Sequence, residues 1–559
     1  MEDLDPIVQH DNLSPYAGRW IASIGDQIIG QGGTPAQALH AAQASRPKEI
    51  PLITYVPPPQ PLQIHPFLEK IAAHLAPDMP VYVVGGAIRD ALIGHPVREL
   101  DFIVPGNAIR HARKLADRVQ GAFYVLDRER DYGRVLIPQS GSSPLVLDFA
   151  PIQGADLDAD LKNRDFTINA MAAGITPPYE RYDPLGGAAD LLDKKLRTCS
   201  PAAIASDPIR ILRGVRFSIN YGLKAEKDTK EYMRSAVERL PEMSAERIRD
   251  ELFKIFDSRN PKAAVQVLDM LGALELILPE LHALHDIHQS APHIDDVWDH
   301  TLSVAKNLRS ILDALGPAYN PDSSSNLFMG VITHRLGRYR DQLAEHLQQN
   351  LVQSRTIKSL NIMAALYHDC GKPETREIDP DGQIRFINHE LVSSDLVVKR
   401  AGGLQLSNEE TKRLKTIVRH HMRPVWLAQT GKLPSRRAKF RFFRDTQAAG
   451  VDICLLSLAD TLGTYGHTLP PDTWKQQVDV VRSLLEAWWE RKEQEVSPPP
   501  LLDGNDLMRE FKLEPGRLIG QLLDGITEAQ ATGSVNNQRQ AYEHAGLLLR
   551  ELEDDRPGK

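Results

Sequence analysis

The stretch that most constrains the fold runs from Val81 to Val104, VYVVGGAIRDALIGHPVRELDFIV. Val81–Val84 is a short apolar run, and Gly85-Gly86 follows it directly. Ala87–Ile93 favours a short helix, and Leu100–Val104 is a second apolar run. The pattern predicts a strand, a glycine turn, a helix and a second strand. Backbone N–H groups in such a glycine turn can approach a polyphosphate with no side chain in the way.

Two carboxylates, Glu99 and Asp101, stand at the start of the second strand. Residues two apart in a strand point to the same face, so these side chains are expected within a few ångström of each other. Carboxylates held that close repel unless a cation lies between them, which favours a divalent ion. A phosphate turn beside a metal pair is the minimal equipment for nucleotidyl transfer. The alternative is an ordinary turn followed by a solvated strand edge.

Composition sets the class of protein. The chain has 559 residues and a net charge of -8, so several domains are expected and a globally basic nucleic-acid coat is not. The three cysteines, Cys199, Cys370 and Cys454, are far apart and form no CxxC, which argues against a disulfide framework or a zinc ribbon. No apolar run approaches membrane-spanning length and the start, MEDLD, is acidic, so we expect a cytoplasmic protein without membrane contact.

Residues 1–60 are expected to form a small accessory ββα-like module. The segment GRWIASIGDQIIGQGG alternates like a hairpin with Gly25-Asp26 in its turn, and Thr34 and Pro35 then begin a helix. From Tyr55 onward the proline-rich run VPPPQP predicts a stiff linker. The module carries no visible chemistry.

The next segment, 62–200, alternates helix and strand. A helix is expected over Ala108–Val119, and strands over Phe123–Leu126, Arg134–Pro138 and Leu145–Phe149. Asp148 lies inside the last apolar strand, where a carboxylate is costly unless it is paired or metal-bound. It is therefore the third candidate metal ligand.

Two polar patches follow. Arg164 and Asp165 precede an expected helix on which Asn169 shares the face of Asp165, with helix capping as the alternative. Further on, Ser206–Phe217 is expected to be a helix with Asp207, Arg210, Arg213 and Arg216 in one row. An Asp and an Arg together can read the Watson–Crick edge of C or A, whereas the alternative is a solvated face with an ordinary ion pair.

Six motifs in this order resemble class II tRNA nucleotidyltransferases and bacterial poly(A) polymerases. They are GGAIRD from Gly85, ELD from Glu99, NRDFTINA from Asn163, DPLGG from Asp183, DPIRILR from Asp207 and SAERIRDEL from Ser244. The resemblance implies an α+β protein with a polymerase β-like head (62–200), a mostly α-helical neck (201–285) and helical parts that hold tRNA. Two residues depart from the family pattern: Glu99 stands where Asp is common, and Ser206 where Glu is usual.

The resemblance, together with the residues, implies template-independent addition of C and/or A from CTP and ATP to the tRNA 3′ end. Catalysis would use Mg2+, and the nucleotide would be held by a larger set of residues. The expected catalytic and Mg2+ residues are Glu99, Asp101 and Asp148, and the expected nucleotide-binding residues are Gly85, Gly86, Arg89, Arg164, Asp165, Asn169, Asp207, Arg210 and Arg213. The alternatives are a poly(A) polymerase or an enzyme that adds only CC or only A.

A second candidate site lies in 286–470, which is rich in histidine. Its residues are His300, His368, Asp369, His389, His420, His421 and Asp460. Histidine and carboxylate ligands on separate helices suit a transition metal. The order resembles the HD phosphohydrolase superfamily, which implies Ni2+, Mn2+ or another transition metal and a phosphohydrolase activity. An alternative of another class is therefore a nucleotide phosphohydrolase whose head is regulatory.

The last two features are candidate RNA contacts. SRRAKFRFFRDT, Ser435–Thr446, mixes cations with phenylalanines, which suits phosphate contact and base stacking or, equally, a helix with its aromatics in the core. The tail, 475–559, is expected to be helical, and its turn Glu514–Arg517 opens a helix that either holds a phosphate or simply connects two helices.

Overall fold

The computed structural model describes residues 16, 19–25, 27–56, 62–75, 80–139, 142–317, 327–352 and 355–554. The chain forms two compact units, Met1–Asp193 and Lys194–Lys559. The division comes a few residues before the expected end of the head at 200. The boundary lies there because β11 (Lys195–Leu196) pairs with β12 (Lys224–Ala225) and so belongs to the second unit.

The N-terminal module contains one strand more than expected. Strand β1 (Arg19–Ile24) pairs with β2 (Gln27–Gly32) on one side and with β3 (Leu52–Val56) on the other. Helix α1 (Pro35–Ser45) begins as expected, with the Thr34 side chain accepting from the Gln37 N–H at 3.3 Å. The expected ββα arrangement is therefore ββαβ: Leu-Ile-Thr-Tyr-Val has strong strand propensity, and the linker prediction began inside it. Asp26 and 57–61 lie outside the described residues.

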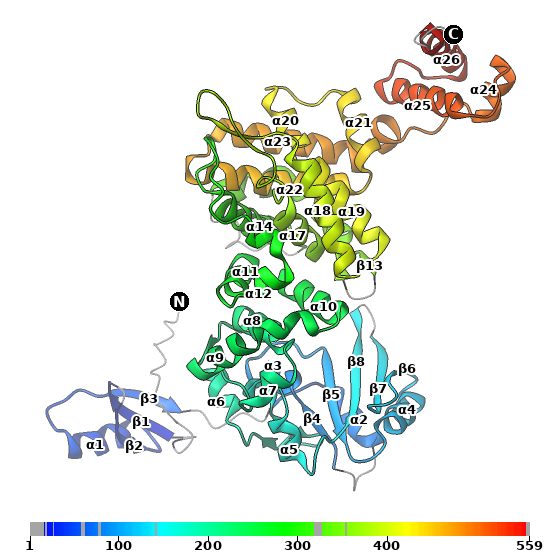
Figure 1. The fold of residues 1–559 in the computed structure, drawn as a ribbon. Helices are drawn as coiled ribbons and strands as arrows, with labels where there is room; N and C mark the ends of the chain where they lie inside the picture. The colour runs from blue at the N-terminus through cyan, green and yellow to red at the C-terminus, as the bar shows by residue number, and fades with distance from the viewer. Residues whose placement is uncertain are drawn as a thin grey trace. The chain divides into compact units, whose positions relative to one another are not determined.

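The head is built on a seven-stranded sheet with the order β10-β9-β4-β5-β8-β7-β6 (Figure 1). Only β5 and β8 pair in parallel; the other neighbours are antiparallel. Phe102 of β5 stacks on Phe149 of β8 with ring centroids 4.8 Å apart, inside the core. The strands are β4 (Tyr82–Val84), β5 (Glu99–Val104), β6 (Ala122–Asp127), β7 (Tyr132–Gln139), β8 (Ser142–Pro151), β9 (Ala172–Gly174) and β10 (Arg181–Tyr182).

The head helices agree with the expected ones except at one place. Asn169 lies in a single 3-10 turn, η2 (Thr167–Asn169), and not in the α-helix predicted after Asp165. The next helix approaches this turn so closely that a Cβ on Gly187 would lie 2.0 Å from the Thr167 carbonyl oxygen. The helices are α2 (Leu68–His74), α3 (Gly86–Leu92), α4 (Ala108–Val119), α5 (Leu157–Lys162) and α6 (Gly187–Leu192).

The second unit begins with short helices. The helix predicted from Ser206 begins only at Arg210, and Asp207 has an extended backbone with φ -151°. The reason is Pro208, which disfavours helical conformation in the residue before it. The helices are α7 (Ala202–Ser206), α8 (Arg210–Tyr221), α9 (Lys227–Ala236), the 3-10 segment η3 (Val237–Glu242), α10 (Ala245–Phe256), α11 (Pro261–Met270), α12 (Ala273–Ile277) and α13 (Pro279–His282).

A larger helical body follows, organised around α22, whose residues 449–463 are all buried. Helices α14, α17 and α19 pack against it. The elements are α14 (Val297–Ala314), α15 (Leu327–Leu336), η5 (Gly337–Tyr339), α16 (Arg340–Gln348), β13 (Asn350–Val352), β14 (Arg355–Thr356), α17 (Ile357–Tyr367), β15 (Arg376–Ile378), β16 (Ile384–Phe386), α18 (His389–Gly403), α19 (Asn408–His420), α20 (Arg423–Gln429), α21 (Arg436–Thr446), α22 (Ala449–Tyr465) and η6 (Gly466–Thr468).

The tail is helical, as expected, and has a core of its own around Leu507, Leu522 and Ile526. Its elements are α23 (Pro471–Trp489), the π-helical turn η7 (Lys492–Val496), α24 (Gly504–Phe511), α25 (Arg517–Thr532) and α26 (Gln538–Asp554). The α+β prediction is confirmed. No helix among the described residues has the length and apolar character to cross a membrane.

Helix α21 settles one of the open sequence interpretations. Its phenylalanines, Phe440, Phe442 and Phe443, are buried, so they belong to the core and are not available for base stacking. Its cations are paired within the second unit: Lys439 with Glu495, and both Arg437 and Arg441 with Glu528.

Candidate active site and metal centre

The acidic face of the head sheet is formed by its two parallel strands. Asp101 of β5 is in register with Asp148 of β8, and Glu99 lies two residues before Asp101 on the same strand. Gly85, with φ +72°, closes in on this face: a Cβ there would lie 3.6 Å from Asp101 Oδ2 and 3.3 Å from Arg164 Nη1. The glycine turn, an acid and an arginine therefore border one small space, which a side chain at position 85 would fill.

Arg134, on β7, is a member of this site that the sequence analysis missed. Its Nε and Nη2 donate to the two oxygens of Asp148, each at 2.7 Å. The hydrogen bond to Asp148 raises the pKa of Arg134 despite partial burial, and the charges of Glu99 and Asp101 add to the effect. Asp148, the expected third metal ligand, is thus already held in a bidentate ion pair. The sequence carried a signal for this pair. Strand Arg134–Pro138 directly precedes the strand of Asp148, and consecutive strands often pair, which would place Arg134 opposite Asp148.

Arg89 and Asn169 form a buried frame behind the glycine turn. Arg89 Nη1 donates to Asn169 Oδ1 at 2.6 Å, and Asn169 Nδ2 donates to Asp165 Oδ1 at 3.2 Å. Arg89 is 7% exposed and also donates to Asp90 through Nε and Nη2. These hydrogen bonds show that Arg89 also positions the turn, while its predicted contact with the triphosphate stays a prediction.

Arg164 is placed differently from Arg89. It donates from Nε and Nη2 to Asp160, each at 3.0 Å, while Nη1 lies next to the space over Gly85. The hydrogen-bond donor next to this space is the guanidinium of Arg164, and the groups that could bind a metal ion are carboxylate oxygens. Glu99 is exposed and Asp101 half-buried. An all-oxygen set with partial solvent access fits Mg2+, which keeps several waters and binds one or two carboxylates together with substrate phosphates.

The predicted base-reading pair lies in the second unit. Asp207 Oδ2 accepts from Arg247 Nη2 at 2.7 Å and lies 4.0 Å from Arg210 Nε. Arg210 Nη1 donates to the Ala203 carbonyl at 3.1 Å. Asp207 Oδ1 has no hydrogen-bond partner among the residues that the structure describes. The Asp–Arg pair is therefore joined by a second arginine, Arg247, and keeps one carboxylate oxygen for a further donor.

Arg213 and Arg216 follow Arg210 on α8, and both lie beside the ring of Phe217. Their guanidinium carbons lie 5.8 Å and 4.5 Å from the ring centroid of Phe217. Arg216 also pairs with buried Glu251 at 2.9 Å. Burial alone would raise the pKa of Glu251, but the charges of Arg216 and Lys254 bring it below its usual value. Arg216 thus holds α8 against α10. The predicted row of polar residues is therefore reduced to Asp207, Arg210 and Arg213.

Six of the seven predicted residues of the histidine site converge in the body. His300 Nε2 lies 3.2 Å from Asp460 Oδ1 and 3.4 Å from Asp369 Oδ2. The other three imidazoles surround Asp369, with Nε2 to carboxylate distances of 3.2 Å for His368 and His389 and 3.9 Å for His421. All six side chains are buried, and they come from α14, the end of α17, α18, the end of α19 and α22.

The orientation of three rings favours metal coordination. His368, His389 and His421 each hold a backbone carbonyl with Nδ1, at 2.7, 2.9 and 2.7 Å. A ring whose Nδ1–H is tethered in this way presents the lone pair of Nε2. These Nε2 atoms are buried and lie 3.2–3.9 Å from Asp369, but none of them makes a well-directed hydrogen bond to a described residue. Buried orphan acceptors around two carboxylates are what a transition metal satisfies.

His420 is the predicted residue that the structure leaves out. It is half-buried, and the charges acting on its ring are Arg423, Asp445 and Arg419, not the two site carboxylates. Successive residues on a helix are about 100° apart, so His420 and His421 cannot both face one point. Burial, together with the charges of His368 and His389, lowers the pKa of His421 to about 3.

Two residues of this site were missed, Lys372 and His293. Lys372 Nζ lies 2.7 Å from Asp369 Oδ2 and donates to Gln289. His293 packs edge-on against His300 at 5.2 Å, and burial with the charge of Lys372 lowers its pKa to about 4. Both line a cavity of about 440 Å³ with Asp369 and Asp460. The signals were the Gly371-Lys372 that follows the His-Asp pair, and a histidine seven residues before His300.

Five family models match successive parts of the chain. Residues 81–197 match the poly A polymerase head domain, 297–463 the HD domain, and 481–545 tRNA nucleotidyltransferase domain 2. Residues 222–284 match the family described as "Probable RNA and SrmB- binding site of polymerase A", and 11–59 a family of unknown function.

Full-length relatives decide the family. The A-adding tRNA nucleotidyltransferase of Deinococcus radiodurans is 31% identical over 469 residues, which cover 82% of this chain and 93% of the relative. The chain belongs to the tRNA nucleotidyltransferase family. Within this family, the CC-adding enzyme of Geobacter sulfurreducens is 29% identical, over 83% of this chain and 90% of the relative.

Solved structures of this family share the fold. A CCA-adding enzyme in complex with ATP matches with a TM-score of 0.52 and 18% identity, covering 86% of this chain and 94% of that one. A structure of a CCA-adding enzyme without nucleotide, apo form I, gives a TM-score of 0.51 with 18% identity, over 86% and 92%. The predicted resemblance to tRNA nucleotidyltransferases with an HD domain is confirmed.

Proposed function

We propose that this protein adds C and/or A to the 3′ end of tRNA, using CTP and ATP and no nucleic-acid template. The observation that carries the proposal is the space bordered by Gly85, Asp101 and Arg164 at the parallel pair of strands. Phosphate-binding and metal-binding groups meet there as nucleotidyl transfer requires. Two relatives that match more than four fifths of the chain, an A-adding and a CC-adding enzyme, support tRNA as the substrate.

In the head, we assign Glu99 and Asp101 to Mg2+, with Asp148 as a third carboxylate held by Arg134. When bound, the metal supplies Lewis-acid activation of the primer hydroxyl and neutralisation of the triphosphate. The Gly85 N–H donates to the Met171 carbonyl at 3.1 Å, so the role of Gly85 is to leave space for the triphosphate without a side chain. Gly86, the first residue of α3, would offer its backbone N–H, and Arg164 Nη1 borders the same space. Arg89, Asp165 and Asn169 hold the turn in place.

In the second unit, we assign nucleotide selection to Asp207 and Arg210, with Arg213 beside them. Asp207 Oδ1 can accept from an exocyclic amine of C or A, which U and the matching position of G do not offer. Arg247 holds the other carboxylate oxygen and so fixes the direction of the free one. The specificity for C and A then comes from these side chains, which take the place of a nucleic-acid template.

The deciding experiment uses one tRNA prepared with its 3′ end before, within and after CCA. Each nucleotide is offered separately with Mg2+, and products are sized on a gel. Addition of C to the shortest tRNA followed by A indicates full CCA addition. Addition of only CC or only A identifies a partial enzyme, and long A tails identify a poly(A) polymerase. No addition to any end would overturn the proposal and favour a phosphohydrolase with a regulatory head.

A second activity is favoured by the buried histidine site. We propose that His300, His368, Asp369, His389, His421 and Asp460 hold Ni2+, Mn2+ or another transition metal and that the site hydrolyses phosphate esters. The support is the set of buried Nε2 atoms that converge on Asp369 without well-directed hydrogen bonds, and the cavity of about 440 Å³ that reaches Asp369 and Asp460. Lys372 beside Asp369 provides positive charge for a substrate phosphate.

The test of this second activity is Asp369→Asn, which keeps the shape of the side chain beside Lys372. Turnover of phosphomonoesters and 2′,3′-cyclic phosphates should rise with Ni2+ or Mn2+ in the wild type and vanish in the variant. CCA addition with Mg2+ should persist in the variant. Equal transition-metal content in both proteins would show that the cluster is not a metal site.

Because tRNA matures in the cytoplasm, we propose that the protein is located there.

A further inference from the structure

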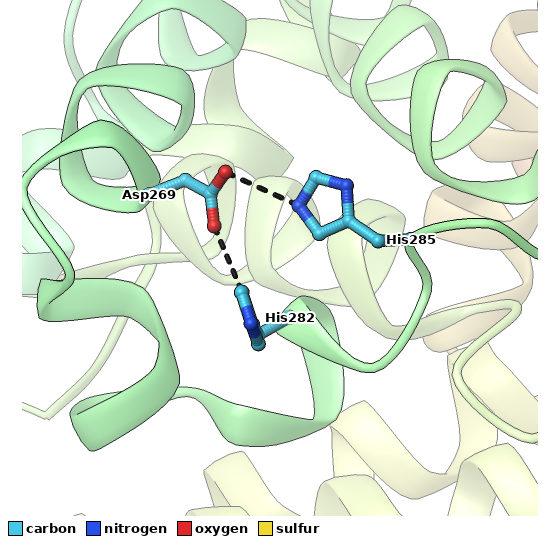
Figure 2. Close-up of side chains that lie close together, drawn as sticks. All are labelled: Asp269, His282 and His285. Atoms are coloured by element: carbon cyan, nitrogen blue, oxygen red, sulfur yellow. Dashed lines mark hydrogen bonds and ion pairs between the residues drawn. The ribbon is translucent and has the colours of Figure 1, made fainter.

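A third group of metal-ligating side chains lies outside both sites. It consists of Asp269 near the end of α11, His282 at the end of α13, and His285 in the turn that follows (Figure 2). His282 Nδ1 lies 2.9 Å from Asp269 Oδ1, and His285 Nε2 lies 3.1 Å from Asp269 Oδ2. Two imidazoles from a neighbouring segment thus each point one nitrogen at a different oxygen of the same carboxylate.

The chemistry of this trio suits a borderline transition-metal ion. Two imidazole nitrogens and one carboxylate oxygen are the ligand set of open zinc sites. Ligands about 2.0–2.2 Å from a tetrahedral ion are about 3.4 Å apart. The two imidazole–carboxylate pairs, at 2.9 and 3.1 Å, would have to open by a few tenths of an ångström. One ligand atom from each of the three residues lies within 4.8 Å of the others, so the remaining distance has to close by about 1.4 Å at most. Rotation of partly exposed side chains is enough for that change.

Access and orientation support the same reading. The side chains of His282, His285 and Asp269 are 42%, 34% and 20% exposed, so an ion can enter and keep at least one water. His285 is also held from its other side, because its ring packs on Trp298 of α14 with centroids 4.2 Å apart. The ring of His285 is therefore already oriented. None of these three residues belongs to the buried histidine site of the body.

We propose that Asp269, His282 and His285 bind one divalent transition-metal ion of the zinc class. Coordination balances without a change of charge on neutral rings: His282 Nδ1 and His285 Nε2 give up their hydrogen bonds to Asp269, and each ring proton moves to the other nitrogen. The ion joins the end of α11 to the segment that leads into α14. This clamp is independent of the nucleotidyl-transfer assignment and of the HD assignment.

The test is a zinc titration of the full-length protein. The protein is stripped with a chelator and kept in excess Mg2+, and Zn2+ binding is followed by competition with a chromophoric chelator. The double variant His282→Gln/His285→Gln should bind one equivalent fewer than the wild type. The matched control is His288→Gln, since His288 is an exposed histidine of the same segment and lies outside the trio; this variant should keep the equivalent.

Two further arms keep the result decisive. The same loss of one equivalent is expected when the comparison is repeated in an Asp369→Asn background, which separates the trio from the HD site. In the same Asp369→Asn background, the Co2+-loaded protein with an intact trio should show a visible d–d band that the double variant lacks. If circular dichroism shows that the double variant does not fold, Asp269→Asn takes its place. Equal zinc equivalents in the wild type and the folded variant, or an equal loss with His288→Gln, would overturn the proposal.

Discussion

The head and the body each gather acidic side chains, but they solve the problem of like charges differently. In the head, Glu99 is exposed and Asp101 half-buried, and the charge of Asp148 is offset by Arg134 from the neighbouring strand. In the body, Asp369 and Asp460 are buried among four imidazoles and one lysine. The first arrangement suits a hard ion that arrives with a nucleotide, and the second suits a resident transition metal.

The difference lies in what remains unsatisfied. In the head the guanidinium of Arg134 meets both oxygens of Asp148, so the charge of this one carboxylate is offset before a substrate binds. In the body the Nε2 atoms of His368, His389 and His421 have no hydrogen-bond partner among the described residues. Buried polar atoms without hydrogen bonds are costly, and the ion proposed for the body site would remove that cost.

The largest effect is expected for Asp101→Ala. Loss of a shared metal ligand should lower nucleotide addition by about 1,000-fold, equivalent to about 4 kcal/mol of transition-state stabilisation. Single-turnover assays with saturating tRNA measure it, and phosphatase turnover should be unchanged. The matched control is Asp117→Ala, an exposed aspartate on α4 of the head. Addition within about tenfold of the wild type would remove the metal assignment.

Asp452→Asn tests whether any buried His–Asp cluster of the body behaves like a metal site. Asp452 is fully paired, with His346 at 2.8 Å, Asn361 at 2.9 Å and Arg413 at 2.7 Å. Removing its charge should lower the free energy of unfolding by about 3 kcal/mol, measured by urea unfolding, with metal content unchanged. If Asp452→Asn lost both stability and bound metal, the hydrogen-bonded Asp452 cluster and the proposed metal site would not be independent.

The same residue gives a pH dependence. Burial alone would raise the pKa of Asp452, but the charges of His346 and Arg413 hold it below its ordinary value. Because the folded pKa is the lower one, the stabilisation is present above the unfolded pKa of about 3.9 and is lost as pH falls through the folded pKa. Acid unfolding should therefore be less steep in Asp452→Asn than in the wild type.

A pair of neighbouring histidines sharpens the definition of the body site. His421→Gln should weaken transition-metal binding by about 100-fold, since a ligand is lost, whereas His420→Gln should leave binding unchanged. Metal analysis after dialysis against a graded chelator distinguishes them. An equal loss of metal binding in both variants would contradict the assignment of His421, and not His420, to the site.

Base selection is expected to cost less than catalysis. Asp207→Ala or Arg210→Ala should reduce discrimination of CTP and ATP against UTP and GTP by about tenfold, the value of one base-edge contact. Competition assays with all four nucleotides measure this, with Asp228→Ala, an exposed residue of α9, as the control. A uniform loss for all nucleotides with selectivity retained would make the segment structural.

The smallest effect is expected for Arg134→Gln. Without this cation, Asp148 is released and the negative potential around Glu99 and Asp101 increases. The Mg2+ concentration at half-maximal addition should fall by about threefold, because a half-exposed ion pair is worth less than 1 kcal/mol. Magnesium titrations of the addition rate measure the shift. A higher midpoint, or loss of addition, would indicate that Arg134 acts on the substrate itself.

Part of the site was readable because its signals are local. The spacing of Glu99 and Asp101, the glycine turn and helix Ala108–Val119 all follow from rules that act over a few residues. Even the error at Asp207 has a local cause, since Pro208 excludes a helical conformation before it. The third strand of the N-terminal module was likewise available in Leu52–Val56 but was hidden by the prolines that follow.

The sequence by itself determined the family, the α+β class and the division between an oxygen-rich head and a histidine-rich body. Tertiary structure alone decided that Arg134 meets Asp148, that His421 and not His420 enters the cluster, and that Asp269 faces His282 and His285. The physical reason is range: periodicity and turn chemistry fix the direction of a side chain within its own element. Pairings between elements depend on strand register and helix packing, which no single segment encodes.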